Sequence, residues 1–168
     1  RAHHLAAMFN SLSTCNGFAE SPVCIFVDGA KGDQDRDDVE AVRCFVESID
    51  LPNVVHVFRD RNHGLRHSIH DGVSRMCEQY GRVVVLEEDF QLSRRTLDYF
   101  NACLDRYSED ACVWSVVAYQ FEAPGLRARK TAFALPFAHP WGWATWKRAG
   151  DQFELDVPIP EETLRSPS

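Results

Sequence analysis

The sequence predicts an α/β protein with a mostly parallel central sheet and helices packed on both faces of the sheet. Short apolar segments of strand length alternate with longer segments in which apolar residues recur at helical spacing. One short segment, 83–86, is four consecutive apolar residues, a composition typical of a strand buried on both faces. The first element is a helix, whereas a doubly wound domain starts with a strand, so we expect the first strand to be missing. We therefore expect one domain over 1–168, truncated at one or both ends.

The elements follow from periodicity and from the residues at their ends. Leu5, Met8, Phe9 and Leu12 have the spacing of one helix face, and Asp37 and Asp38 are suited to capping a second helix. The predicted helices cover 3–12, 37–49, 64–80, 93–107 and 141–149, and the predicted strands cover 22–27, 54–58, 82–86, 112–119 and 131–137. The loop at 120–130, which contains Pro124 and Gly125, separates the last two predicted strands and is a candidate lid over a ligand.

Composition excludes several classes of partner. The net charge is −7 without an offsetting basic stripe, so we expect neither nucleic acid nor an anionic membrane as a partner. No apolar run has the length of a transmembrane segment. The six cysteines form no Cys-x-x-Cys pair, and most lie in apolar segments, which favours reduced core thiols and a cytoplasmic protein. The glycine motifs of nicotinamide dehydrogenases, P-loop kinases and α/β-hydrolases are absent.

Three acids, Glu87, Glu88 and Asp89, follow the buried strand directly. In open α/β sheets, ligands bind beyond the carboxyl ends of the strands, and carboxylate oxygens are the ligands that Mg²⁺ and Mn²⁺ prefer. The alternative is a strand that runs into an acidic, solvated turn. Asp28 follows the predicted strand at 22–27, where it would either accept the imide N–H of a pyrimidine base or form a turn before Gly29.

The start of the helix at 64–80 carries polar residues that suit an anion. Asn62, Gly64 and Arg66 could contact a phosphate through backbone N–H groups and a guanidinium. His63, His67 and His70 share the same helix face at a spacing that could bind Zn²⁺, but the pattern favours a polar helix turn that faces ligand or water. Further along, Trp141, Gly142, Trp143 and Trp146 make an aromatic run that is either core packing or a platform for a sugar ring.

These motifs together resemble those of metal-dependent glycosyltransferases of the GT-A fold. They are Arg59-x-Arg61-Asn62-x-Gly64-Leu65-Arg66, Val83-Val84-Val85-Leu86-Glu87-Glu88-Asp89 and Trp141-Gly142-Trp143-Ala144-Thr145-Trp146, in that order. The likeness is greatest to the branch that contains N-acetylglucosaminyltransferase I and its bacterial sugar-transferase relatives, and it covers residues 1–155. It implies a Rossmann-like nucleotide-sugar domain that transfers a sugar from a donor, expected to be a UDP-sugar, to an acceptor hydroxyl with inversion.

The resemblance also assigns roles. Asp89 would bind Mn²⁺ or Mg²⁺, Asp28 would hold uracil, and Glu87 and Glu88 would contact the nucleotide sugar. The family motif usually reads Glu-Asp-Asp, so Glu88 departs from it. Other donor-binding residues would be Arg1, Asn62, Gly64, Arg66, Trp141, Gly142 and Trp143. The acceptor would be a glycan, a lipid-linked sugar or a protein, and the chain would be cytoplasmic or membrane-peripheral, or in the Golgi lumen of a eukaryote.

The base that deprotonates the acceptor is not fixed by the sequence. The family has a carboxylate about twenty residues after the tryptophan motif, and Glu161, Glu162 and Asp151 are the candidates. Two other functions stay open. A nucleotidyltransferase would need a glycine-rich first loop followed by Arg, which this sequence lacks. A non-catalytic nucleotide- or sugar-binding domain would agree with the uncertain base and with Glu88.

Overall fold

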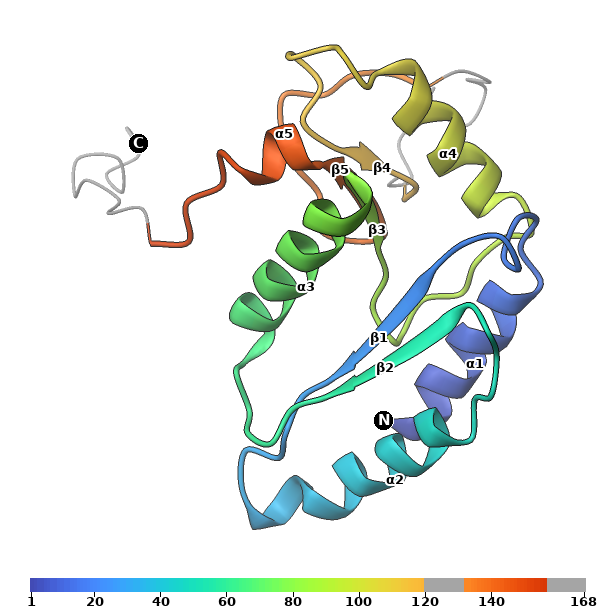
Figure 1. Ribbon diagram of the computed structural model, residues 1–168, viewed down its shortest axis with the longest axis vertical. Helices are drawn as coiled ribbons and strands as arrows, with labels where there is room; N and C mark the ends of the chain where they lie inside the picture. The colour runs from blue at the N-terminus through green and yellow to red at the C-terminus, as the bar shows by residue number, and fades with distance from the viewer. Residues whose placement is uncertain (120–131, 157–168) are drawn as a thin grey trace, which may run out of the picture.

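The structure is a computed structural model in which residues 1–119 and 132–156 are described (Figure 1). The helices are α1 (Ala2–Ser13), α2 (Arg36–Glu47), α3 (Leu65–Tyr80), α4 (Thr96–Arg106) and the short α5 (Lys147–Gly150), with a 3₁₀ turn, η1 (Asp33–Asp35), before α2. The strands are β1 (Val23–Val27), β2 (Val54–Phe58), β3 (Arg82–Val85), β4 (Val116–Val117) and β5 (Trp143–Trp146). None of the described helices is long and apolar enough to cross a membrane. The α/β class is confirmed.

The strands form two sheets within the described residues. β1 and β2 pair in parallel, from Val23 opposite Val54 to Val27 opposite Phe58. The second sheet has the order β3-β5-β4, and β5 runs antiparallel to both of its neighbours. A single, mostly parallel sheet is therefore not formed by the described strands. The parallel part is confined to β1 and β2, and a long-range antiparallel strand holds the second sheet together.

Helices cover both faces of the first sheet. The apolar stripe of α1 and the last turn of α2 build the first core together with strand residues; its buried members are Leu5, Met8, Phe9, Leu12, Cys15, Phe18, Val27, Val46, Ile49 and Leu97. On the other face α3 lies so close to β1 that a Cβ added at Gly72 would be 3.4 Å from the ring of Phe26. Glycine at this position lets the helix backbone approach the sheet.

A second, smaller core lies beneath the second sheet. It contains Phe100, Leu104, Val116, Ala144 and Trp146, and the indole Nε1 of Trp146 donates a hydrogen bond to the Leu104 carbonyl at 3.0 Å. The Arg148 guanidinium lies over the Trp146 ring, 4.5 Å from its centroid. It donates hydrogen bonds to three backbone carbonyls in the segment after α4, those of Tyr107, Ser108 and Val113. Trp146 is therefore a core residue, which agrees with core packing, one of the two alternatives given for the tryptophan run.

Three predicted elements differ from the structure. The strand expected at 112–119 is paired only at Val116–Val117, and 132–137 forms no strand, in keeping with proline at 136. The helix expected from Trp141 is wrong: the run forms strand β5, and only Lys147–Gly150 is helical. Aromatic and β-branched residues suit a central strand, and β5 is flanked by β3 and β4. The candidate lid at 120–130 lies outside the described residues.

Candidate functional site

The acidic turn Glu87–Asp89 follows the carboxyl end of β3 directly. The turn is closed by Phe90, whose backbone N–H donates to the Glu87 carbonyl at 3.4 Å. Glu88 and Asp89 are exposed, and Glu87 is half-buried. Burial raises the pKa of the Glu87 carboxyl, and the neighbouring Asp89 and Glu88 charges raise it further. The turn thus concentrates negative charge beyond the carboxyl end of β3.

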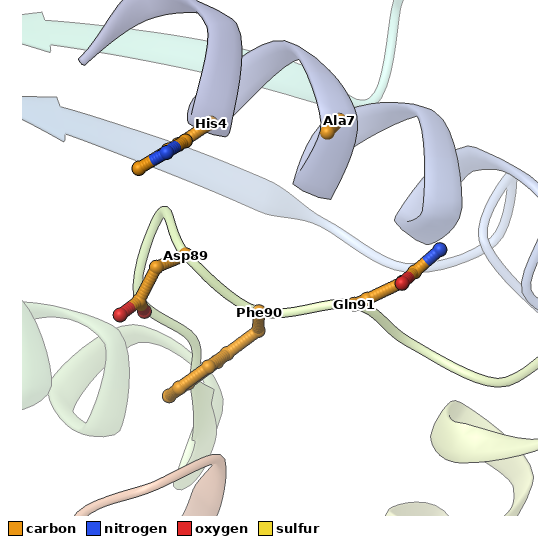
Figure 2. A pocket seen from close by; sticks show the side chains of 5 residues that line it. All are labelled: His4, Ala7, Asp89, Phe90 and Gln91. Carbon is orange, nitrogen blue, oxygen red and sulfur yellow. The ribbon is translucent and has the colours of Figure 1, made fainter.

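A small pocket lies between this turn and the start of α1. It is lined by His4, Ala7, Asp89, Phe90 and Gln91 and has a volume of about 230 Å³ (Figure 2). His4 and Ala7 face the 89–91 segment from one side of α1. Sequence reasoning found Asp89 but missed the other four residues, because nothing in the local pattern shows which helix face meets the turn.

The antiparallel pairing of β3 with β5 brings the tryptophan motif beside the acidic turn. Val85 is the last paired residue of β3, and Trp143 lies opposite it. Beyond this pair β3 continues into Leu86 and Glu87, and β5 is preceded by Gly142 and Trp141. Gly142 has a φ of +63°, a conformation that favours glycine, so its backbone direction depends on that residue.

Trp141 is the exposed member of the motif. Its side chain is exposed at 46%, and its ring lies against those of Tyr119 and His139, with centroid distances of 4.9 and 5.0 Å. Tyr119 also stacks on His139 at an interplanar angle of 19°. Tyr119 follows β4, and His139 and Trp141 precede β5. They form an aromatic surface beyond the last β3–β5 pair, a suitable platform for a flat or sugar-like ligand.

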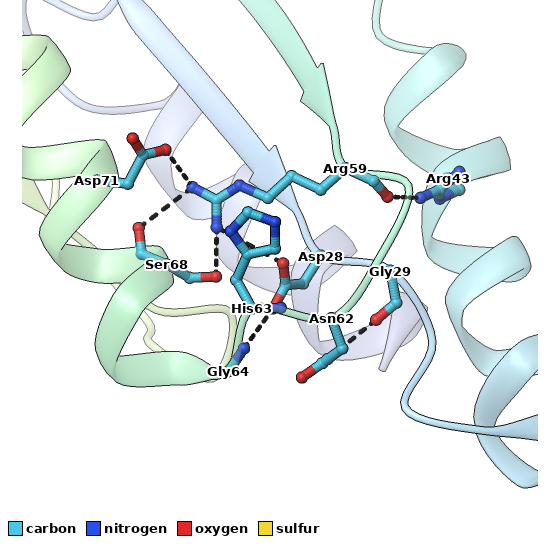
Figure 3. A network of polar contacts seen from close by, with 9 residues as sticks. All are labelled: Asp28, Gly29, Arg43, Arg59, Asn62, His63, Gly64, Ser68 and Asp71. Carbon is cyan, nitrogen blue, oxygen red and sulfur yellow. Dashed lines mark hydrogen bonds and ion pairs between the residues drawn. The ribbon is translucent and has the colours of Figure 1, made fainter.

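Asp28, at the end of β1, organises the start of α3 (Figure 3). Its Oδ2 accepts hydrogen bonds from the backbone N–H groups of His63 and Gly64 at 2.9 and 3.0 Å. Its Oδ1 lies 3.5 Å from a guanidinium nitrogen of Arg59 and has no hydrogen-bond partner among the described residues. Asp28 thus caps a turn with one oxygen, and the second oxygen keeps an unused acceptor.

Arg59 is buried at the end of β2 and ties this turn to α3. Its guanidinium binds the Asp71 carboxylate at 2.6 Å and also bonds Ser68. Asn62 donates to the Gly29 carbonyl at 2.9 Å, and a Cβ at Gly29 would lie 2.6 Å from the backbone of Arg61. Asn62 therefore holds the ends of β1 and β2 together, and sequence reasoning missed this role because its partner is far away in the chain.

The remaining predicted donor-binding residues are less closely grouped. The Gly64 N–H that was expected to meet a phosphate is engaged by Asp28. Arg66 is exposed and pairs with Asp156 at 3.1 Å, and Arg1 is exposed at the start of α1. His63, His67 and His70 do not belong to any metal-holding group among the described residues.

The candidate base Asp151 lies at the other end of the second sheet. Both of its carboxylate oxygens accept hydrogen bonds from Lys147 at 2.8 Å, and the backbone N–H of Lys147 bonds the Gly81 carbonyl just before β3. The acidic turn follows the opposite end of β3, so the structure does not bring Asp151 and Asp89 together. The other candidates, Glu161 and Glu162, lie outside the described residues.

The acidic turn has suitable chemistry for a divalent cation. Its oxygens are hard ligands, and the pKa of Glu87 is raised chiefly by burial and further by the charges of Asp89 and Glu88, a repulsion that a bound cation would relieve. No three His, Cys, Asp or Glu side chains of the described part of the chain converge on one ion position. The turn is therefore suited to an ion that protein oxygens hold only in part, as Mg²⁺ is commonly held with waters and phosphates.

Comparison with known proteins gives no match. No family model matches the chain, and no curated protein or solved structure matches it. The likeness to GT-A glycosyltransferases rests on the sequence motifs and stays a prediction.

Proposed function

We propose that this chain is the nucleotide-sugar domain of a metal-dependent glycosyltransferase with a GT-A-like fold. The donor is a UDP-sugar, and the acceptor offers a hydroxyl group. The single observation that carries the proposal is the β3–β5 pairing. It brings the acidic turn and the start of the tryptophan run, which are more than fifty residues apart in the sequence, to one end of one sheet.

The roles follow from the positions of the acids. Asp89, exposed at the pocket, would hold Mn²⁺ or Mg²⁺, and Glu87 and Glu88 would lie beside the donor. When bound, the metal ion supplies positive charge that stabilises the diphosphate leaving group. Arg66, on the first turn of α3, adds a further positive charge that is screened by Asp156 until that pair separates.

Asp28 would recognise the base. Its Oδ1 lies beyond the carboxyl end of β1 and has no hydrogen-bond partner among the described residues. It is buried and faces Arg59 at 3.5 Å, so the side chains around it must move before a base reaches it. A carboxylate oxygen in that state can accept the imide N–H of uracil, which a cytosine ring does not offer. Oδ2 is meanwhile fixed by two backbone N–H groups, so the carboxylate is held in place before the ligand binds.

The test is thermal unfolding with UDP or GDP, each with and without Mn²⁺. A nucleotide at about one hundred times its Kd adds about 2.7 kcal/mol of stability, which corresponds to a rise of several degrees in Tm. We expect this rise with UDP and Mn²⁺ together. It should be absent in Asp89→Ala, because this substitution removes the proposed metal ligand.

Glu109→Ala is the matched control, since Glu109 is an exposed acid after α4 and away from the acidic turn. This variant should keep the full response to UDP and Mn²⁺. A folded protein whose Tm does not move with either nucleotide contradicts the proposal. An equal loss in both variants would mean that the metal acts through general charge screening rather than at Asp89.

A second candidate function is a non-catalytic nucleotide-binding domain. The observation that favours it is the position of Asp151 at the far end of β3, which leaves the acidic turn without that candidate base. Release of UDP from a UDP-sugar separates the two functions. Turnover supports the transferase, whereas tight Mn²⁺-dependent binding of UDP without any turnover supports the binding domain.

A further inference from the structure

β1 and β3 each have one edge that no described strand pairs. Among the described strands β1 pairs only with β2, β3 pairs only with β5, and no strand pairing joins the two sheets. Apart from Arg82 the residues of both strands are apolar, and apart from Val27 they are only partly buried. Strands with this composition are normally buried on both faces and paired on both edges. We call the space between β1 and β3 the strand slot.

The hydrogen-bond pattern shows which backbone groups face the slot. Val23 N donates to Asn53 O, and Arg59 N donates to Val27 O, so the backbone N–H and C=O groups of Val23 and Val27 point toward β2. Because successive residues of a strand alternate in direction, Cys24 and Phe26 direct their N–H and C=O groups to the slot.

The same reasoning applies to β3. Lys147 N donates to Gly81 O, just ahead of the first β3–β5 pair. Alternation then directs Val83 and Val85 to β5, and it directs the N–H and C=O groups of Val84 to the slot.

Helices cover both faces of the slot. The first core, built on the apolar stripe of α1, includes Ile25 of β1 on one side and Leu86, which follows β3, on the other. On the opposite face α3 packs on Phe26 through Gly72 and also packs against β3. Any occupant would therefore lie between two apolar layers and between two rows of backbone donors and acceptors. A single extended strand with apolar residues on both faces would pack against both apolar layers and pair with both rows of backbone groups.

The direction of the chain decides where such a strand comes from. His4, near the start of α1, lines the same pocket as Asp89, which follows the carboxyl end of β3 (Figure 2). A strand parallel to β1 and β3 would end at this edge, where a short loop reaches α1. The connection strand–α1–β1 would then put α1 on the same face as α2 in β1–α2–β2, as right-handed crossovers require (Figure 1).

We propose that the strand slot takes a single apolar β-strand that runs parallel to β1 and β3 and leads directly into α1. Its two neighbours, β1 and β3, have five and four residues. This strand joins the two sheets into one, with its neighbours in the order β2-β1-strand-β3-β5-β4. The proposal rests on the open edges and on the helices that cover them, and it requires no nucleotide or metal.

The test compares the 168-residue chain with the same chain carrying an N-terminal extension. The extension has about five alternating Val and Ile residues and a polar loop of about three residues. Residue-resolved hydrogen exchange follows the amides of Cys24, Phe26 and Val84. We expect these amides to exchange at least about tenfold more slowly in the extended chain. Ile25 and Val83, directed to existing partners, serve as internal references.

The matched control carries proline at alternate positions of the same extension, which removes the donors that a paired strand needs. It should leave the three amides unchanged. The same Val-Ile strand added as a free peptide should slow the same amides, so the test does not depend on the folding of the extended chain.

Three results would overturn the proposal. The first is equal slowing by the proline control. The second is full protection of the three amides in the unextended monomer, which would mean that β1 and β3 already close on each other. The third is protection that rises with protein concentration without any extension, which would identify a second copy of the chain as the occupant.

Discussion

At the scale of single residues, Glu87 links the stability of the protein to the ligand that it is proposed to bind. Its carboxyl is half-buried, next to two further acids, and burial and these charges raise its pKa. A carboxyl with a raised pKa in the folded state favours folding at low pH, and this contribution is lost as pH rises through that pKa. The charged turn is therefore a cost to the free protein at neutral pH.

Glu87→Gln should raise the Tm of the metal-free protein at about pH 7, because the substitution removes a charge that burial and the two neighbouring acids disfavour. At about pH 4, where the native carboxyl is protonated, the two proteins should have the same Tm. Thermal unfolding across this pH range measures the difference, with Glu109→Gln as the exposed-acid control. A Tm gain that is independent of pH would assign the effect to packing rather than to charge.

The same substitution should weaken the response to Mn²⁺. The native protein gains stability when a cation relieves the repulsion, and Glu87→Gln has less repulsion to relieve. A Mn²⁺-induced rise in Tm that is equal in both proteins would place the ion elsewhere.

At the scale of elements, Arg59 joins β2 to the start of α3. Its side chain is only 7% exposed, and it faces Asp28 at 3.5 Å and Asp71 at 2.6 Å. Removing one partner of a buried ion pair leaves the other charge uncompensated. The position of α3, and with it the turn that Asp28 caps, therefore depends on one guanidinium group.

Arg59→Met should lower the free energy of unfolding by about 2–3 kcal/mol, less than the loss for a fully buried pair because Asp71 is half-exposed. Urea denaturation measures the loss. Arg36→Met is the control: its pair with Asp33 is exposed at 72% and 93%, and its removal should change stability by no more than about 0.5 kcal/mol. Equal losses in the two variants would contradict a specific role for the Arg59 pairs.

At the scale of the whole molecule, the described residues have two hydrophobic cores rather than one. The first core lies around α1, α2 and β1, and the second lies around α4, β4 and β5. No hydrogen-bonded strand pair joins the two sheets. The two halves should therefore open separately under native conditions.

Phe100→Ala tests this expectation, since Phe100 is fully buried in the second core. The loss of its ring should cost about 3–5 kcal/mol and should release the amides of β4 and β5 much more than those of β1 and β2. Val46→Ala, fully buried in the first core, should give the opposite pattern by hydrogen exchange. Equal release of all amides by both variants would show one cooperative unit.

Much of the local structure could be predicted from the sequence. The helices α1, α2 and α3 begin and end within three residues of the predicted limits, because each has a strong apolar stripe. The strands before Asp28 and before Glu87 were also predicted correctly, since each is a short β-branched run followed by polar residues. The acidic turn could be located for the same reason.

The pairing could not be predicted in this way. A helix is predicted for the tryptophan run, whereas its β character depends on two distant partners, β3 and β4. Likewise, nothing near Asp28 reveals that His63 and Gly64 donate to it, and nothing near Asp151 reveals its distance from Asp89. These relations are set by long-range packing.

The antiparallel position of β5 also affects how the protein can be modified. The acidic turn and the tryptophan run are held side by side by the register of Val85 with Trp143, and not by the length of chain between them. A change of chain length at the exposed Ala111, ahead of β4, should therefore leave the distance between the two motifs unchanged. A tag or domain inserted at this position should leave the acidic turn and the start of the tryptophan run side by side.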